Sequence, residues 1–172
     1  MGMRDLGNII ADQLSRSLTK CDPVFVFMKG LTMKKKVFVS FDYEKDRFYY
    51  YLLKAWDANS NFDFTMVDKT PNEIQSDSVA VVKRALSRKI SEASYTLVII
   101  GEDANKVHPD HVEIGYRNWQ NYEVAKSYEL GNRLVGVKID DGNESPEQLY
   151  GKGATWARTF SQDSIVAALN KA

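Results

Sequence analysis

A tryptophan and a glutamate lie four residues apart in the segment NWQNYE, residues 118–123. Side chains at positions i and i+4 of a helix share one face, so Glu123 would lie one turn along from Trp119 on a helix that begins near Trp119. A carboxylate in an active site can stabilise positive charge that develops in a reaction. A carboxylate in a first helical turn also interacts favourably with the helix dipole. The pair alone therefore leaves a catalytic role and a capping role open.

His108 and His111 are the only histidines, and Asp110 and Glu113 lie close to them in the sequence. These side chains are common metal ligands, so the group has the composition of a metal site. Pro109, between the two histidines, argues against a regular helical face that would bring both rings together. We therefore interpret this segment as a polar loop and expect no metal.

No glycine-rich phosphate-binding motif follows any apolar run of the chain. This absence argues against a Rossmann cofactor domain and against a P-loop nucleotidase. Asp42, Asp68, Asp103 and Lys138 are residue types that a phosphoacceptor receiver domain uses, but only one acid follows the first predicted strand, where a receiver has an acidic pair. No Ser–His or Cys–His pair is marked by a nucleophile motif.

The elements that must position these groups alternate in type along the chain. Compact apolar runs predict strands at 36–41, 61–68, 94–101 and 133–140. Apolar residues at helical spacing predict helices near 44–56, 78–90, 119–130 and 161–171. This alternation predicts right-handed crossovers and an α/β fold: a flavodoxin-like, doubly wound sandwich with a central parallel sheet of about five strands flanked by helices.

Two of these helices carry an apolar face at helical spacing. In the helix at 44–56, the residues that share a face are Phe48, Tyr51, Leu52, Ala55 and Trp56. In the helix at 78–90, they are Val79, Val82, Leu86 and Ile90. We expect both faces to pack against the sheet.

The first 33 residues do not follow this alternation. We interpret residues 1–33 as an N-terminal extension of uncertain role, or as the product of a start codon upstream of Met33, and residues 34–172 as the α/β domain. The extension would either pack on the core or mediate self-association.

Composition excludes several classes of partner. The 23 Lys and Arg residues balance the 23 Asp and Glu residues, so no overall field attracts nucleic acid or an anionic membrane. No apolar run approaches the ~20 residues that span a bilayer. Cys21 is the single cysteine, which excludes an internal disulfide and a cysteine-based zinc site. We expect a protein of the cytoplasm.

A parallel sheet of this kind binds ligands beyond the carboxyl ends of its strands. The first predicted strand ends in Ser40 and Phe41, followed by Asp42 and Tyr43. Asp68 ends the second predicted strand. The helix that begins near Trp119 points its N-terminus to the same edge, so we expect the ligand there.

Four segments, in this order, resemble the TIR-like family, which includes NAD-consuming sensor proteins of the bacterial Thoeris antiphage system. They are VFVSFDY, LLKAWDANSNFDFTMVD, SYTLVIIG and WQNYEVAKSYELGNRLVGVKI. The resemblance covers residues 34–139. It implies a TIR-like fold and cleavage of the bond between nicotinamide and ribose, as in an NAD glycohydrolase or ADP-ribosyl cyclase.

The resemblance also implies roles for particular residues. Glu123 matches the catalytic glutamate, and Trp119 the tryptophan four residues before it. Ser40 and Phe41 match a serine–aromatic pair, and Asp68 opens the loop that gates the pocket. We add Asp42 and Tyr43 as substrate-binding candidates, because both directly follow the end of the first predicted strand. An aromatic ring such as that of Phe41, Tyr43 or Trp119 can stack on a ring of the substrate. NAD would be the substrate, with no cofactor.

Two other functions stay open. A non-enzymatic module would assemble through residues 68–78 and helix faces, and a nucleoside deoxyribosyltransferase-like enzyme would use a glutamate at an anomeric carbon. For the NAD-cleaving enzyme, the expected partners are NAD, further copies of the chain, and a downstream effector reached by a diffusible nucleotide signal such as a cyclic ADP-ribose.

Overall fold

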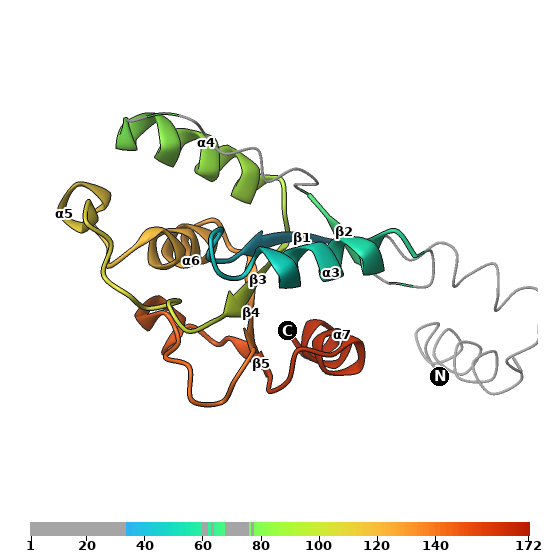
Figure 1. Ribbon diagram of the computed structural model, residues 1–172. Coiled ribbons are helices and arrows are strands. Elements are labelled where there is room, and N and C mark those ends of the chain that lie inside the picture. Colours follow the sequence, from blue (N-terminus) through green and yellow to red (C-terminus); the bar gives the residue numbers. More distant parts are fainter. Residues whose placement is uncertain (1–33, 60–61, 63, 68–75, 77) are drawn as a thin grey trace, which may run out of the picture. The chain divides into compact units, whose positions relative to one another are not determined.

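The computed structural model describes residues 34–172 except 60–61, 63, 68–75 and 77 (Figure 1). Residues 34–172 form one compact unit. Residues 1–33 lie outside the described part of the chain, so the interpretation of that segment as an extension stays a prediction. None of the helices in the described part is long and apolar enough to cross a membrane.

Five parallel strands form one sheet in the order β2-β1-β3-β4-β5. They are β1 (Lys35–Ser40), β2 (Phe64–Met66), β3 (Tyr95–Ile100), β4 (Arg133–Lys138) and β5 (Thr155–Ala157). This is the flavodoxin-like order, in which the direction of winding reverses between β1 and β3. The predicted α/β, doubly wound architecture is confirmed.

Helices cover both faces of the sheet (Figure 1). One face carries α3 (Arg47–Asp57) and α7 (Gln162–Lys171), and the other carries α4 (Val79–Ser91) and α6 (Trp119–Glu129). A short helix, α5 (His111–Ile114), and a 3-10 turn, η1 (Glu147–Leu149), lie in the segments that follow β3 and β4.

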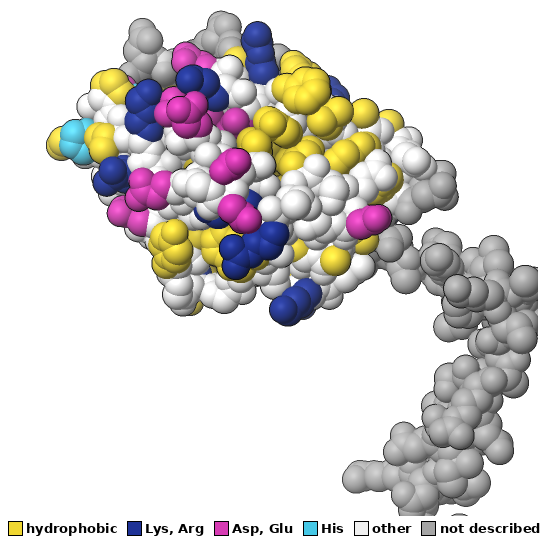
Figure 2. Space-filling view, turned by 60° about the horizontal axis from the view of Figure 1, so that its bottom comes forward, with side chains coloured by type: hydrophobic (Ala, Val, Ile, Leu, Met, Phe, Trp, Pro, Cys, Tyr) yellow, Lys and Arg dark blue, Asp and Glu magenta, His cyan; other side chains and the backbone are white. Residues whose placement is uncertain are grey.

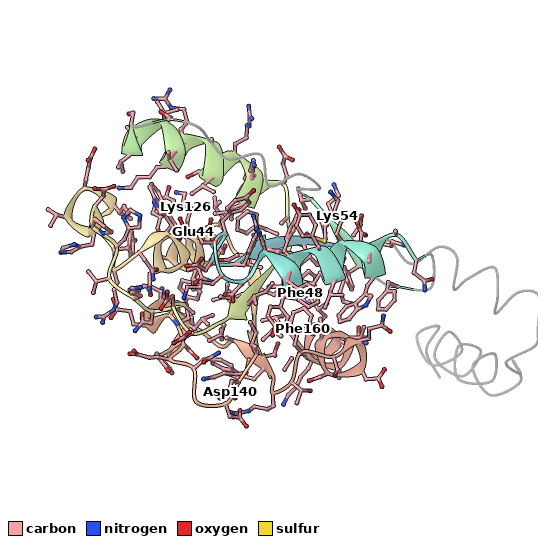
Figure 3. All side chains as sticks on the ribbon, viewed as in Figure 1. Glu44, Phe48, Lys54, Lys126, Asp140 and Phe160 are labelled. Carbon is pink, nitrogen blue, oxygen red and sulfur yellow. The ribbon has the colours of Figure 1, made fainter. Side chains whose placement is uncertain are left out.

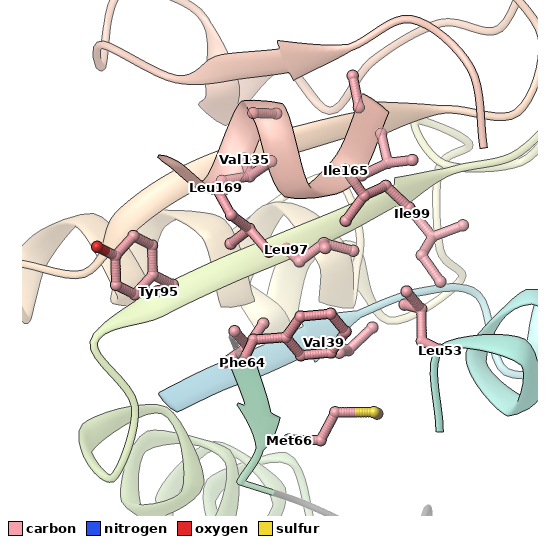
Figure 4. Close-up of a cluster of buried hydrophobic side chains, with 14 of the residues drawn as sticks. Val39, Leu53, Phe64, Met66, Tyr95, Leu97, Ile99, Val135, Ile165 and Leu169 are labelled. Carbon is pink, nitrogen blue, oxygen red and sulfur yellow. The ribbon is translucent and has the colours of Figure 1, made fainter. Parts of the chain in front are cut away.

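The larger hydrophobic core lies between the sheet and the α3/α7 layer (Figure 4). Its buried side chains include Val39, Leu53, Phe64, Leu97, Ile99, Val135, Ile165 and Leu169. Burying a side chain of this size stabilises the fold by about 1.5–3 kcal/mol relative to leaving it exposed. All six residues of β3 are buried, as expected for a central strand covered on both faces.

The strands begin and end close to their predicted bounds, with two differences. β2 has three residues, Phe64–Met66, inside the predicted strand at 61–68. β5 lies in a stretch that the sequence leaves without a strand. Its three residues form an edge strand that is only partly buried, so its side chains show neither a continuous apolar run nor a clear alternation.

The predicted core-facing side of α3 is wrong. Phe48 is 64% exposed and Tyr51 is 49% exposed, whereas Tyr50 and Leu53 are buried. All six residues in FYYYLL are apolar or aromatic, so periodicity does not identify the buried face. Hydrophobic side chains accordingly reach the molecular surface, where several gather in the view of Figure 2.

Phe160, just ahead of α7, helps to fix which side of α3 is buried (Figure 3). Its ring centroid lies 4.7 Å from that of Tyr49 and 5.6 Å from that of Trp56. These contacts join α3 to the segment just ahead of α7. One of them is made by Tyr49, which is not part of the predicted core-facing side. In α4, by contrast, Val79 and Ile90 are buried as predicted.

Candidate active site

The carboxyl ends of β1 and β3 open on a pocket of about 680 Å³, a size typical of small-molecule sites. Its lining comes from the end of β1, the loop that follows it, α4, the loop after β3 and the first turns of α6. Its lining residues include Phe41, Asp42, Tyr43, Glu44, Lys89, Asp103, Lys106, His108, Pro109, Asn118, Trp119, Gln120 and Glu123.

Glu123 and Ser40 meet at this pocket although 83 positions separate them in the chain. The Ser40 hydroxyl donates a hydrogen bond of 2.5 Å to Oε2 of Glu123. Ser40 is the last residue of β1 and is buried, whereas Glu123 is partly buried on α6. Sheet and helix together therefore hold one carboxylate in a fixed orientation.

Burial raises the pKa of Glu123 to about 7. The hydrogen bond from Ser40 and the charge of Lys89 act in the opposite direction and lower the pKa. Both favour the ionised carboxylate against the cost of burial. A carboxyl group with a pKa raised to near neutrality by burial, at the edge of a pocket, is typical of an active site.

Trp119 lies at the start of α6 and lines the pocket one turn before Glu123. Its ring packs edge-on against Tyr122, with ring centroids 5.9 Å apart at an interplanar angle of 88°. A second edge contact, 6.4 Å at 72°, joins it to His108. The indole is thus held as a pocket wall by neighbours on two elements.

Asn118 fixes the start of α6 as its N-cap. Its Oδ1 accepts a hydrogen bond of 2.9 Å from the backbone N–H of Asn121. Its Nδ2 donates to the carbonyl oxygens of Ala104 and Lys106 at 3.1 and 2.8 Å. One buried side chain therefore caps the helix and attaches it to the loop after β3.

A second layer of buried amides supports this cap. Asn121 Nδ2 donates to Asn105 Oδ1 at 3.1 Å, and Asn121 Oδ1 accepts from the backbone N–H of Gln148 at 3.1 Å. Gln120 Nε2 donates to the Ile99 carbonyl oxygen at 3.0 Å. We call Asn118, Trp119, Gln120 and Glu123 the α6 wall of the pocket. Side-chain amides of α6 attach it to β3, to the loop after β3 and to the chain after β4.

The facing side, residues 41–44, is the β1 loop wall. Phe41 stacks on Tyr50 of α3 with ring centroids 4.7 Å apart, and its centroid lies 6.2 Å from that of Tyr43. Asp42 Oδ1 accepts hydrogen bonds of 2.9 Å from the backbone N–H groups of Glu44 and Lys45. The Asp42 carboxylate therefore also shapes the turn on which it lies.

Asp46 anchors this wall, and sequence reasoning missed it. Its backbone N–H donates to the Asp42 carbonyl oxygen at 2.8 Å, and its side chain is buried against Gly101. A Cβ at Gly101 would lie 2.2 Å from Asp46 Oδ1, so only glycine fits there. Within the described residues, Oδ2 has no hydrogen-bond partner. Burial, followed by the neighbouring charges of Asp42 and Asp103, raises the pKa of Asp46 to about 6.

Two lysines bring positive charge to the pocket, and neither was predicted. Lys89 of α4 lies close enough to Glu123 to lower the pKa of that carboxyl group. Lys106 pairs with Asp103 at 3.2 Å, and Lys45 approaches the same carboxylate at 3.8 Å. The lysine side chains of these two pairs are largely exposed, so each pair contributes little to stability.

The structure brings most of the predicted site residues together. Phe41, Asp42, Tyr43, Trp119 and Glu123 line one pocket, and Ser40 joins them through Glu123. Asp68 lies outside the described residues. In the described part of the chain, no three His, Cys, Asp or Glu side chains are grouped so that they could hold a metal.

Two solved structures resemble this chain, and the first of them shares its fold. The CMP N-glycosidase BcmB of Clostridium botulinum is 11% identical, with a TM-score of 0.51 over 80% of this chain and 98% of that one. A 2-deoxyribosyltransferase of Bacillus psychrosaccharolyticus is 16% identical, with a TM-score of 0.46 over 75% of this chain and 90% of that one. No curated protein matches the chain.

Residues 38–144, more than half of the chain, match the family described as Thoeris protein ThsB, TIR-like domain. The matched segment runs from β1 to beyond β4, and it contains both Ser40 and Glu123. The resemblance seen in the ordered sequence segments is confirmed. The chain belongs to the TIR-like domain family of the Thoeris protein ThsB.

Proposed function

We propose that this protein is an NAD-cleaving enzyme of antiphage defence that breaks the bond between nicotinamide and ribose. The observation that carries the proposal is the Glu123 carboxylate, held by Ser40 at 2.5 Å in a pocket that Trp119 also lines. Membership in a Thoeris family supports the defence role. The fold that it shares with an N-glycosidase is compatible with this chemistry but does not carry the proposal.

The reaction needs little more than one carboxylate. The C1′–N bond breaks, and its electron pair goes to the nicotinamide nitrogen, so the cationic ring leaves as a neutral molecule. No general acid is required, unlike the two-carboxylate arrangement of most glycosidases. Glu123 would bind ribose hydroxyls and stabilise the positive charge that develops on the sugar.

The electrostatics of the pocket fit this role. With a pKa of about 7, Glu123 is partly protonated at neutral pH. The positive nicotinamide ring, held close by, would lower this pKa and favour the ionised form. Trp119, Phe41 and Tyr43 offer aromatic surfaces for stacking on the rings of the substrate.

Two nucleophiles can complete the reaction at C1′. Attack by water, with loss of a proton, gives ADP-ribose. Attack by an atom of the adenosine part, again with loss of a proton, gives a cyclic ADP-ribose. We propose the cyclic product as a diffusible signal to a downstream effector in the cytoplasm, and we propose that copies of the chain associate when activated.

The test is nicotinamide release from NAD, measured with purified protein and in phage-challenged cells. Replacing Glu123→Gln should reduce the rate at least about 100-fold, because it removes the charge that stabilises the transition state. Glu129→Gln is the matched control, since Glu129 lies on the same helix but is 68% exposed and pairs with Lys126. Equal release by wild type and Glu123→Gln contradicts the proposal.

The other two functions predict different results in the same variants. A non-enzymatic module would keep its defence activity with Glu123→Gln and lose it when residues 68–78 are altered. A nucleoside deoxyribosyltransferase-like enzyme would exchange bases on deoxynucleosides and release no nicotinamide from NAD. Either pattern would replace NAD cleavage as the assignment of this pocket.

A further inference from the structure

His108 lies on the pocket in a segment whose backbone is fixed by hydrogen bonds. Its N–H donates to the Arg117 carbonyl oxygen at 2.8 Å, and its carbonyl oxygen accepts from the His111 N–H at 3.0 Å. Both His108 and the following residue, Pro109, line the pocket. The loop that the sequence predicted as polar thus presents one of its two histidines at the candidate active site.

The orientation of the imidazole is also defined. The backbone N–H of Asp110 donates to Nδ1 of His108 at 3.1 Å, and the Asp110 carboxylate lies 3.8 Å from the same nitrogen. Because Nδ1 accepts this hydrogen bond, Nε2 carries a proton and is the ring's donor. The edge contact with Trp119, at 6.4 Å between centroids, holds the ring on the side of the pocket where the indole lies.

A donor at this position matches a need of the pocket. Its acidic lining groups, Asp42, Glu44, Asp103 and Glu123, accept hydrogen bonds when ionised. NAD, however, presents many acceptor oxygens, on its pyrophosphate and on its carboxamide.

The neutral amides of the lining are already engaged. Asn118 Nδ2 makes two hydrogen bonds to backbone carbonyl oxygens, and Gln120 Nε2 donates to the carbonyl oxygen of Ile99. Lys106 Nζ donates to Asp103. The Nε2–H of His108 is therefore well suited to bind a substrate oxygen.

We propose that His108 is a substrate-positioning residue, which donates its Nε2–H to an acceptor oxygen of the bound dinucleotide beside Trp119. This inference rests on the proposed NAD-cleaving function and adds a specificity contact to it. The acceptor is an oxygen of either the carboxamide or the pyrophosphate. In either case the contact orients the substrate so that C1′ of the nicotinamide-bearing ribose lies at Glu123.

Two replacements of His108 distinguish the effect of its Nε2–H donor from that of the rest of the imidazole. The amide nitrogen of His108→Gln lies near the position of Nε2, so this variant keeps a donor there. The shorter amide of His108→Asn keeps an acceptor for the Asp110 N–H but places no donor at that position. His111→Asn is the matched control, because His111 belongs to the same segment but does not line the pocket.

The experiment measures the kinetics of nicotinamide release, and the binding of NAD to each variant in a Glu123→Gln background. His108→Asn should raise KM and Kd about tenfold, with a smaller effect on kcat, while His108→Gln and His111→Asn stay within about twofold of the parent. Nicotinamide riboside and ADP-ribose then locate the acceptor. If His108→Asn binds nicotinamide riboside more weakly than its parent does, the acceptor is the carboxamide. If it binds ADP-ribose more weakly than its parent does, the acceptor is the pyrophosphate.

The failures of the two proposals are distinguishable. If NAD binds with equal affinity to all the His108 variants and their parent, the positioning role is wrong while NAD cleavage stands. Equal losses in His108→Asn and His108→Gln also contradict it, because the donor would then not matter. If the protein neither binds NAD nor releases nicotinamide, the proposed function itself is wrong.

Discussion

The two walls of the pocket are fixed by different kinds of interaction. Buried amide side chains attach the α6 wall to the loop after β3 and to the chain that follows β4. The β1 loop wall depends on Phe41 stacking on Tyr50 and on the buried Asp46 carboxyl group packed against Gly101. Neutral amides do not titrate, whereas Asp46 does. Glu123 of the α6 wall titrates as well, but the amides that hold this wall do not. We therefore expect the backbone of the α6 wall to keep its geometry across pH and the β1 loop wall to respond to pH.

Breaking the α6 wall should have the largest effect on stability. Asn118→Ala removes the N-cap and leaves the carbonyl groups of Ala104 and Lys106, the first of them buried, without the amide that they share. We expect a loss of about 2–4 kcal/mol in the free energy of unfolding, together with weaker NAD binding. Chemical denaturation and calorimetric titration measure the two quantities.

Ser161→Ala is the matched control for the cap, because the Ser161 side chain accepts a hydrogen bond from the Ser164 N–H at the start of α7, outside the pocket, and its other hydrogen bond is to the exposed Thr159 hydroxyl. It should cost about 1 kcal/mol and leave NAD binding unchanged. Equal destabilisation by the two replacements would show that the amide network adds nothing beyond an ordinary cap.

One carboxyl group at each wall of the pocket, Asp46 at the β1 loop and Glu123 on α6, should make stability depend on pH. Asp46 and Glu123 have pKa values of about 6 and about 7 in the folded protein, raised above the ordinary values of 3.8 and 4.5. The folded state therefore holds more protons than the unfolded state between pH ~4 and ~7, and stability falls as pH rises through that range. Each group contributes on the order of 2 kcal/mol to the fall.

Asp46→Asn removes one of these two titrations and so sharpens the comparison between the walls. In this variant, unfolding free energies measured from pH 4 to 8 should fall by about half as much as in the wild type, because only Glu123 still titrates with a raised pKa. A pH dependence identical to that of the wild type would show that Asp46 does not hold a proton in the folded state.

The hydrogen bond from Ser40 should have the smallest effect. Ser40→Ala removes the donor that favours the ionised form of Glu123, so the pKa of Glu123 should rise further. We expect the pH at which kcat/KM is half-maximal to rise by about one unit, with a loss of stability of at most about 1 kcal/mol. An unchanged pH profile would show that the hydrogen bond from Ser40 does not influence the pKa of Glu123.

Sequence patterns predicted the central strands because buried parallel strands are continuous apolar runs, as in β3. They failed at β5, which is short and half-exposed, and at α3, where all six residues in FYYYLL could equally face the core. Patterning alone does not choose between adjacent faces of so uniformly apolar a helix.

The site was predictable where it followed from helical spacing and strand ends. The four-residue separation placed Trp119 and Glu123 on one pocket wall, and the end of β1 supplied Ser40 and Phe41. Asn118 carried a readable signal that was overlooked, since asparagine directly before a helix is a common N-cap. The contact of Asp46 with Gly101 carried none, because it arises only when two loops meet in three dimensions.

The pH dependence of kcat/KM for nicotinamide release tests the central claim most directly, since it reports ionisation of the free enzyme. The wild type should show activity that rises with pH to a plateau, with a midpoint of about 7 set by Glu123. Glu123→Gln should have a rate at least about 100-fold lower and lose this rise. A flat wild-type profile, together with equal activity in Glu123→Gln, would contradict the assignment of Glu123 as the catalytic carboxylate.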